Sequence, residues 1–208
     1  RDPATVIEEL WKPTFRSEHK ARFQAENSHS VRADVTHGVL ELTLKKKNVF
    51  GWAENPWYRY RDFALEAHIA PDPANGHSSA GVLIRRADER NYYYFLISGD
   101  GHYRFDVVFN GNPRTLIGWT ACPAPADEMA IRVIARGAYF GFYLEDEWIG
   151  EVEDDTIDVG AITLAAQNYD DRETATYRLL DLTVDSRPYE VETQYYRWRR
   201  YVPVDRRQ

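Results

Sequence analysis

Apolar and polar residues alternate along most of the chain after residue 38, and this period of two is typical of β-strands with one buried face. Segment 63–69 (FALEAHI) shows the pattern clearly, because Phe63, Leu65 and Ile69 fall on one face while Glu66 and His68 fall on the other. Runs this short fit strands better than helices. The alternation predicts strands over 39–44, 63–69, 80–86, 92–98, 102–109, 115–119, 130–135, 138–144, 148–152, 161–166 and 176–184.

Short turn sequences separate these runs. Segment 99–101 (GDG) joins 92–98 to 102–109, and segment 110–113 (NGNP) follows it. Glycine- and asparagine-rich links of this length predict antiparallel hairpins. Since no helical run separates the strands, parallel βαβ architectures are excluded. The sequence therefore predicts an all-β fold, a two-sheet antiparallel β-sandwich or jelly roll.

The two ends of the chain differ from this pattern. Segment 2–11 (DPATVIEELW) predicts a short N-terminal helix, because Pro3 suits a first helical turn and apolar residues recur at helical spacing. Segment 12–36 reads as polar and irregular. We expect a β-sandwich domain over 1–186, with its core over about 35–186, and a basic, aromatic C-terminal extension over 187–208. The extension either packs its aromatic residues on the sandwich or serves as a docking segment for a protein partner.

Composition supports a folded domain and removes several functions. Of the 208 residues, 43% are hydrophobic and 28% charged, which is enough to form a core and excludes wholesale disorder. A formal charge of −7 argues against nucleic acid as a partner, and no apolar run is long enough for a membrane span. The single cysteine, Cys122, excludes an intramolecular disulfide and is expected to be an inert, packed thiol. Because the chain starts at Arg1, we expect a processed form or a piece of a longer protein, and the compartment stays open.

The alternation also sorts residues onto two faces of the predicted sheets. The residues expected in the core are Phe63, Leu65, Ile69, Val82, Ile84, Tyr93, Phe95, Ile97, Tyr103, Phe105, Ile162 and Leu164. The residues expected together on the opposite face are Glu66, His68, Arg85, Tyr92, Tyr94, Arg104, Asp106 and Gln167. Aromatic rings stack on the apolar faces of sugar rings, and planar polar groups make paired hydrogen bonds to neighbouring hydroxyls. These eight residues therefore suit a saccharide, although a solvated face closed by ion pairs has a similar composition.

Sequence signatures of catalysis and metal binding are missing. No phosphate loop, zinc-protease or serine-hydrolase motif occurs, and the six histidines show no paired metal spacing. The run Glu145–Glu147 with Glu151 lacks the spacing of a glucanase carboxylate pair and lies at a predicted hairpin tip. No cofactor is expected. Calcium at the turn residues Asp100, Asp170 and Asp171 is the alternative.

A family resemblance rests on segments 81–86 (GVLIRR) and 91–105 (NYYYFLISGDGHYRF), with support from 131–135, Gly137, 142–144, 148–151, 160–166 and 179–184. On these residues the chain resembles the concanavalin A-like lectin/glucanase superfamily, with the nearest likeness to bacterial laminin-G-like, 3-keto-disaccharide hydrolase-type domains. The likeness covers about residues 35–186. It implies a jelly roll whose concave sheet face often binds glycans, either as a module or as an enzyme cleft. The carboxylate motif of the glucanases is absent here.

Three functions follow from this reading. The first is a non-catalytic, lectin-like carbohydrate-binding domain, with stacking by Tyr92 or Tyr94 and an Arg85→Ala variant that loses binding without unfolding. The second is a glycoside hydrolase with the weak candidate pair Glu66 and Asp106. The third is a protein-interaction or structural domain that uses the extension. The aromatic loop 50–60 (FGWAENPWYRY), with Trp52, Trp57 and Tyr58, either walls a groove or closes one end of the sandwich.

Overall fold

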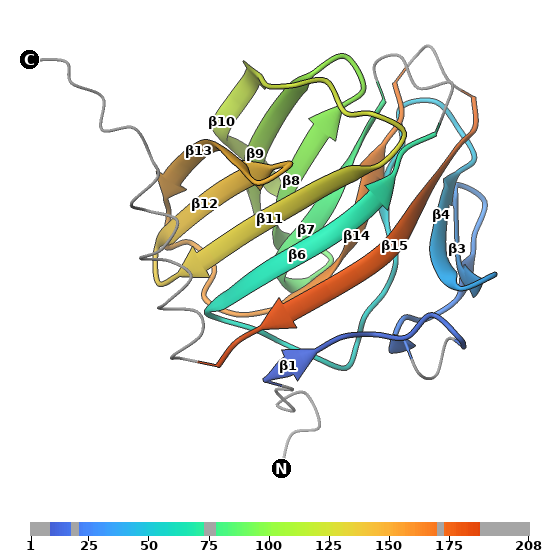
Figure 1. Cartoon of the computed structure of the whole chain (residues 1–208), viewed down its shortest axis with the longest axis horizontal. Coiled ribbons are helices and arrows are strands. Elements are labelled where there is room, and N and C mark those ends of the chain that lie inside the picture. The colour runs from blue at the N-terminus through green and yellow to red at the C-terminus, as the bar shows by residue number, and fades with distance from the viewer. Residues whose placement is uncertain (1–8, 18–20, 73–77, 170–172, 188–208) are drawn as a thin grey trace, which may run out of the picture.

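A computed structural model describes residues 9–17, 21–72, 78–169 and 173–187 (Figure 1). The described chain forms two antiparallel sheets, which confirms the predicted all-β sandwich. The nine-stranded sheet contains β1 (Leu10–Trp11), β2 (Glu26–Asn27), β3 (Val31–Thr36), β4 (Val39–Leu44), β6 (Phe63–Ala70), β11 (Met129–Arg136), β12 (Tyr139–Leu144), β13 (Glu147–Glu153) and β15 (Ala175–Asp185). The six-stranded sheet contains β5 (Phe50–Trp52), β7 (Ser79–Asp88), β8 (Asn91–Ser98), β9 (His102–Phe109), β10 (Asn112–Ala121) and β14 (Ala161–Gln167).

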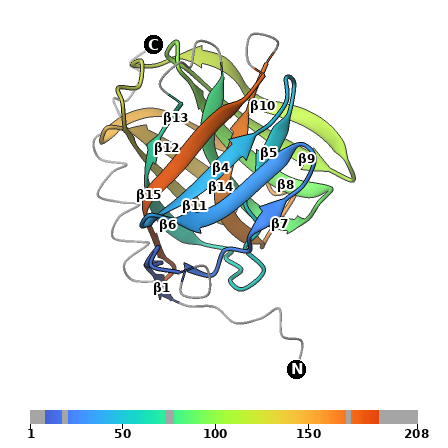
Figure 2. The ribbon, with the colours of Figure 1, turned by 90° about the vertical axis from the view of Figure 1, so that its right-hand side faces the viewer.

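The two sheets pack face to face, with β6, β11 and β15 in front and β7, β8 and β14 behind in Figure 1. The larger sheet has the order β13-β12-β11-β6-β15-β4-β3-β2, and the smaller one β10-β9-β8-β7-β14-β5. In Figure 2, β15 and β4 run side by side, as their antiparallel register requires. Strands adjacent in the sequence therefore often belong to different sheets, as β4, β5 and β6 do.

The core lies between these layers. Every one of the twelve residues expected in the core is buried. Phe95 of the smaller sheet stacks on Phe142 of the larger sheet with ring centroids 4.6 Å apart, and Tyr93 approaches Phe140 to 4.9 Å. Such aromatic pairs add to the free energy gained by burying apolar surface.

Tight hairpins connect many of the strands, as the turn sequences predict. The β9–β10 turn places Asn110 at φ 53° and Gly111 at φ 79°, the left-handed pair that a two-residue hairpin of matching twist requires. The β3–β4 turn uses His37 and Gly38 in the same way. The β12–β13 turn adopts these angles at Glu145 and Asp146, so this acidic run is a hairpin tip.

The N-terminal prediction needs correction. Residues 1–8 lie outside the described residues, and Leu10–Trp11 form strand β1 instead of the end of a helix. Leu10 pairs with Asp185 of β15, and Trp11 is buried against Phe23 and Tyr58. Strand pairing and burial of this tryptophan outweigh a short helical pattern. Strand β3 was also missed, inside the segment that reads as irregular.

The C-terminal extension lies outside the described residues from 188 onwards, so the predicted boundary near 186 stays a prediction. No helix in the described part of the chain has the length and apolar character needed to cross a membrane.

Candidate functional site

Five of the eight predicted face residues lie together on the outer face of the six-stranded sheet. Tyr92 and Tyr94 come from β8, Arg104 and Asp106 from β9, and Gln167 from β14. Tyr94 pairs with Asp106 on one side and with Leu83 of β7 on the other, so these side chains form one row across the sheet. The alternation therefore identified a real shared face.

Glu66 and His68 lie elsewhere, on the outer face of the nine-stranded sheet. Both come from β6, where Glu66 forms an ion pair with Arg132 at 3.0 Å and His68 lies 3.8 Å from Asp181. The whole core separates Glu66 from Asp106, so these two carboxylates cannot face one glycosidic bond and the predicted pair is wrong. Alternation assigns a side chain to a face but does not say to which sheet its strand belongs.

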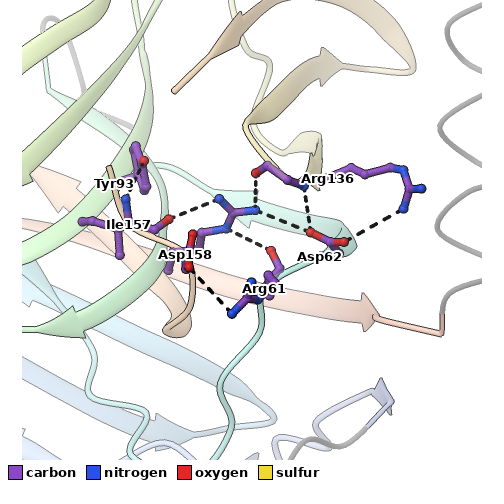
Figure 3. A network of polar contacts seen from close by, with 8 residues as sticks. Arg61, Asp62, Tyr93, Arg136, Ile157 and Asp158 are labelled. Atoms are coloured by element: carbon purple, nitrogen blue, oxygen red, sulfur yellow. Dashed lines mark hydrogen bonds and ion pairs between the residues drawn. The ribbon is translucent and has the colours of Figure 1, made fainter. Parts of the chain in front are cut away.

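Arg85 does not reach the shared face either. It lies at an irregularity of β7 with φ 46°, and its side chain turns into one end of the sandwich, where the residue is 1% exposed. Its guanidinium donates to the carbonyl oxygens of Arg61 at 2.9 Å, Gly137 at 2.8 Å and Ile157 at 3.2 Å (Figure 3).

Two further contacts complete the Arg85 network. The guanidinium lies 3.7 Å from the Asp62 carboxylate and stacks over the Phe140 ring at 4.8 Å. Burial lowers the pKa of Arg85, although the nearby Tyr93 and Asp62 act in the opposite direction. Arg85 therefore links three connecting segments to the core, and these contacts predict that its loss would destabilise the fold, contrary to the expectation from the sequence.

Four aromatic side chains gather on the outer face of the six-stranded sheet. Phe50 lies 5.0 Å from Tyr94 and 6.0 Å from Tyr92, and Trp52 lies 5.4 Å from Tyr92, all between ring centroids. We call Phe50, Trp52, Tyr92 and Tyr94 the aromatic cluster.

Two further strands lie between the rings of the cluster. Strands β7 and β14 separate β8 from β5, and on this face they carry Leu83 beside Tyr94 and the paired small residues Gly81 and Ala165. The rings of β8 and β5 pack against one another across these strands, and Leu83 and Ala165 are fully buried in the same apolar cluster. Phe50, Trp52 and Tyr94 remain partly exposed, so the cluster presents ring surface to solvent.

An arginine held by a buried carboxylate borders the cluster on the β9 side. Asp106 is 1% exposed, and it accepts hydrogen bonds from Arg104 Nε at 2.6 Å and from the Thr115 hydroxyl at 2.8 Å. The Arg104 guanidinium lies over the rings of Tyr94, at 5.9 Å, and of Trp119, at 5.2 Å. Trp119 is 41% exposed on the edge strand β10. These contacts fix the guanidinium plane beside an accessible ring.

A second arginine borders the cluster on the β5 side. Arg86 lies over the Trp52 ring at 5.3 Å and donates to Glu54 at 2.9 Å. Glu54 also accepts a hydrogen bond from the Trp52 indole at 2.8 Å, which fixes the orientation of this ring. The cluster thus lies between two ion pairs, and each of the two carboxylates is bonded to an arginine.

Tyrosine hydroxyls add neutral hydrogen-bonding groups to this face. Burial, together with the charge of Asp106, raises the pKa of Tyr94 to about 12, so its phenol stays protonated at neutral pH. Tyr169 donates to the side-chain oxygen of Gln167 at 3.3 Å. A protonated phenol and an amide suit the hydroxyl groups of a neutral ligand.

Sequence reasoning missed several residues of this face, namely Phe50, Glu54, Arg86, Thr115 and Trp119. The three-residue strand β5 was too short for its alternation to show. Trp52, which was placed in a loop, belongs to β5 and to this face, whereas Tyr58 is buried near Trp11 and Trp57 lies under Arg22.

The prediction of calcium at turn aspartates is not tested by the structure. Asp100 accepts a hydrogen bond from the Ser98 hydroxyl and lies 3.2 Å from His102. Asp170 and Asp171 lie outside the described residues. Within the described ranges, no group of three or more His, Cys, Asp or Glu side chains is placed to hold a metal ion.

Cys122 is expected to react slowly with iodoacetamide. Burial raises the pKa of this thiol to about 11, with a smaller contribution from Asp100, so little thiolate exists at neutral pH. Its alkylation at about pH 8 should be roughly a hundredfold slower than that of glutathione, and the rate should rise up to about pH 11. Mass spectrometry of the alkylated peptide measures this rate, and alkylation as fast as that of glutathione would contradict the described environment.

Comparison with solved structures shows that this fold is similar to jelly-roll folds of known proteins. The chain is similar to the carbohydrate-binding module CBM66 of Bacillus subtilis, with a TM-score of 0.58 and 16% identity over 86% of this chain and 97% of that one. It is also similar to a β-1,3-1,4-glucanase (lichenase) from a mouse hindgut metagenome, with a TM-score of 0.61 and 11% identity over 86% of this chain and 100% of that one. At these identities the likeness shows the fold alone.

One curated relative matches at the sequence level. It is a TPR repeat-containing protein of Treponema pallidum (strain Nichols), 29% identical over 243 residues that cover 92% of this chain. The chain spans 30% of the length of that relative. No family model matches the chain.

Proposed function

We propose that this protein is a non-catalytic carbohydrate-binding domain that holds a saccharide on the outer face of the six-stranded sheet. The observation that carries the proposal is the aromatic cluster, whose exposed ring surface lies between the arginines Arg86 and Arg104. Ring faces stack on the C–H surfaces of a sugar, while guanidinium and phenol groups reach its hydroxyls. The fold, shared with a carbohydrate-binding module, supports this proposal.

The state of the carboxylates favours binding over hydrolysis. A glycosidase needs one carboxyl group free to donate a proton and a second one across the scissile bond. On this face Asp106 is held by Arg104 and Thr115, and Glu54 by Arg86 and the Trp52 indole. Both are used to position neighbouring side chains, which suits a binding surface.

The proposal predicts that Trp52→Ala weakens glycan binding at least about tenfold, because Trp52 offers partly exposed ring surface and its indole is held by Glu54. The full chain is first applied to an array of oligo- and polysaccharides that includes β-1,3-1,4-glucan. Affinity electrophoresis in a retained polysaccharide then compares the variants.

Trp57→Ala is the matched control. Trp57 is 50% exposed, lies under Arg22 and takes no part in the ring contacts of the aromatic cluster, so its loss should leave binding unchanged. Circular dichroism verifies that both variants fold. Equal mobility of Trp52→Ala and the wild type in the retained polysaccharide, or retention by no glycan on the array, would reject the proposal.

A further inference from the structure

A second aromatic group lies on the other side of the molecule, on the outer face of the nine-stranded sheet. It consists of Ile134, Tyr139, Tyr143 and Trp148, which we call the outer patch. The apolar contacts of the patch join residues of β11, β12 and β13 and include no other described element. It is separate from the proposed glycan face.

Burial on this outer face is strongly uneven. Asp185, Ala64 and Ile134 are paired in one row across β15, β6 and β11, and they are 6%, 3% and 1% exposed. On the same face of β6 and β15, further along these strands, the side chains of His68 and Asp181 are 50% and 67% exposed. The outer face of a sheet is normally solvated, so burial of this end indicates a covering segment in addition to the Arg187 guanidinium that donates to Asp185.

The outer patch also contains a buried polar group that needs a partner. The indole nitrogen of Trp148 is buried and has no hydrogen-bond acceptor among the described residues. Buried donors in native proteins are nearly always satisfied. A segment that covers the patch and brings an acceptor to this nitrogen would remove the deficit.

The position of the chain end indicates which segment this is. The described chain ends at Arg187, two residues after Asp185. Asp185 lies in the same row across the sheet as Ile134. Since neighbouring strands lie about 4.8 Å apart, Asp185 and Ile134 are roughly 10 Å apart across β6. The 21 residues 188–208 can span the outer patch in any conformation.

The composition of this segment complements the patch. Its aromatic residues are Tyr189, Tyr195, Tyr196, Trp198 and Tyr201, and its basic residues are Arg197, Arg199, Arg200, Arg206 and Arg207. Carboxylates flank the patch, among them Glu66, which is 46% exposed, and Asp146, which is 79% exposed, and both also pair with Arg132. Rings and guanidinium groups interleaved in one segment match apolar surface bordered by carboxylates.

We propose that residues 188–208 dock on the outer patch of their own chain, with aromatic side chains over Ile134 and Trp148 and arginines towards the acidic border. The docked segment completes the sandwich on the face opposite the proposed glycan site. This inference does not depend on glycan binding.

Photo-cross-linking in the full chain tests the proposal. The change Trp198→p-benzoylphenylalanine places a reactive group in the segment, and mass spectrometry locates its products. We expect cross-links within one chain to peptides of 129–153. The same group at Trp57, a 50% exposed residue of another surface, should give no cross-link to these peptides.

Other products would overturn the proposal. Cross-links between two chains would assign the segment to a second copy, and cross-links to β7, β8 or β9 would place it on the other sheet. A triple variant, Tyr195→Ser, Trp198→Ser and Tyr201→Ser, supplies a second measurement. Hydrogen exchange over 129–153 should accelerate by roughly tenfold in this variant while β7 and β8 stay unchanged, and unchanged exchange over 129–153 would also contradict docking.

Discussion

Replacing Arg85 with alanine is expected to lower the free energy of unfolding by about 3 kcal/mol or more. The change leaves the carbonyl oxygens of Arg61, Gly137 and Ile157 without their donor and opens a void beside Phe140. Each buried acceptor that loses its partner costs about 1–3 kcal/mol, so partial access of water still leaves a large deficit. Urea unfolding followed by tryptophan fluorescence measures this difference.

Arg61→Ala is the control for this experiment. The Arg61 side chain is 63% exposed and pairs with Asp158, which is 67% exposed, although the Arg61 carbonyl belongs to the same network (Figure 3). Exposed pairs of this kind contribute at most about 1 kcal/mol. An Arg85→Ala protein as stable as Arg61→Ala would show that Arg85 does not hold the connecting segments together.

Arg104→Met is expected to destabilise the protein by roughly 3 kcal/mol and to weaken glycan binding. Methionine keeps the apolar stem between Tyr94 and Trp119 but leaves the Asp106 carboxylate, 1% exposed, with the Thr115 hydroxyl and no cation. Breaking a buried ion pair from one side typically costs 3–5 kcal/mol, and the partial exposure of Arg104 places the value near the lower end.

Urea unfolding of Arg104→Met and of a surface control measures this deficit. Arg32→Met is the control, because it removes a pair in which both side chains are at least 40% exposed, so it should change stability by less than about 1 kcal/mol. If Arg104→Met lowers the free energy of unfolding as little as Arg32→Met does, Asp106 is not effectively buried.

The sequence predicted the sandwich well because alternation reports directly on burial. Each of the eleven predicted strands overlaps an observed one, and 39–44 and 102–109 match β4 and β9 at both ends. Strands β1, β2 and β5 were not predicted because two or three residues cannot show a period.

The candidate site was predicted only in part, for a topological reason. Tyr94 and Arg104 could be placed together because β8 and β9 form a hairpin in one sheet. Glu66 was placed with them in error, because β6 and β7 follow one another in sequence but belong to opposite sheets. Arg85 was misplaced because its positive φ at the irregularity of β7 breaks the alternation on which the prediction relied.

The aromatic cluster could not be predicted without knowledge of the sheet topology. Phe50 and Tyr94 are far apart in the sequence, and their rings meet because β14 pairs with both β5 and β7 and so brings β5 into the sheet of β8. Nothing in the local sequence of either residue indicates this contact.

An NMR titration of the full ¹⁵N-labelled chain with an oligosaccharide from a glycan that the array retains tests the proposed binding face most directly. We expect shift changes at the indole signals of Trp52 and Trp119 and at the backbone amides of Tyr94 and Arg104, all on the outer face of the six-stranded sheet. Changes confined to β6, β11 and β12, or to the turns at the ends of the sandwich, would contradict glycan binding on this face.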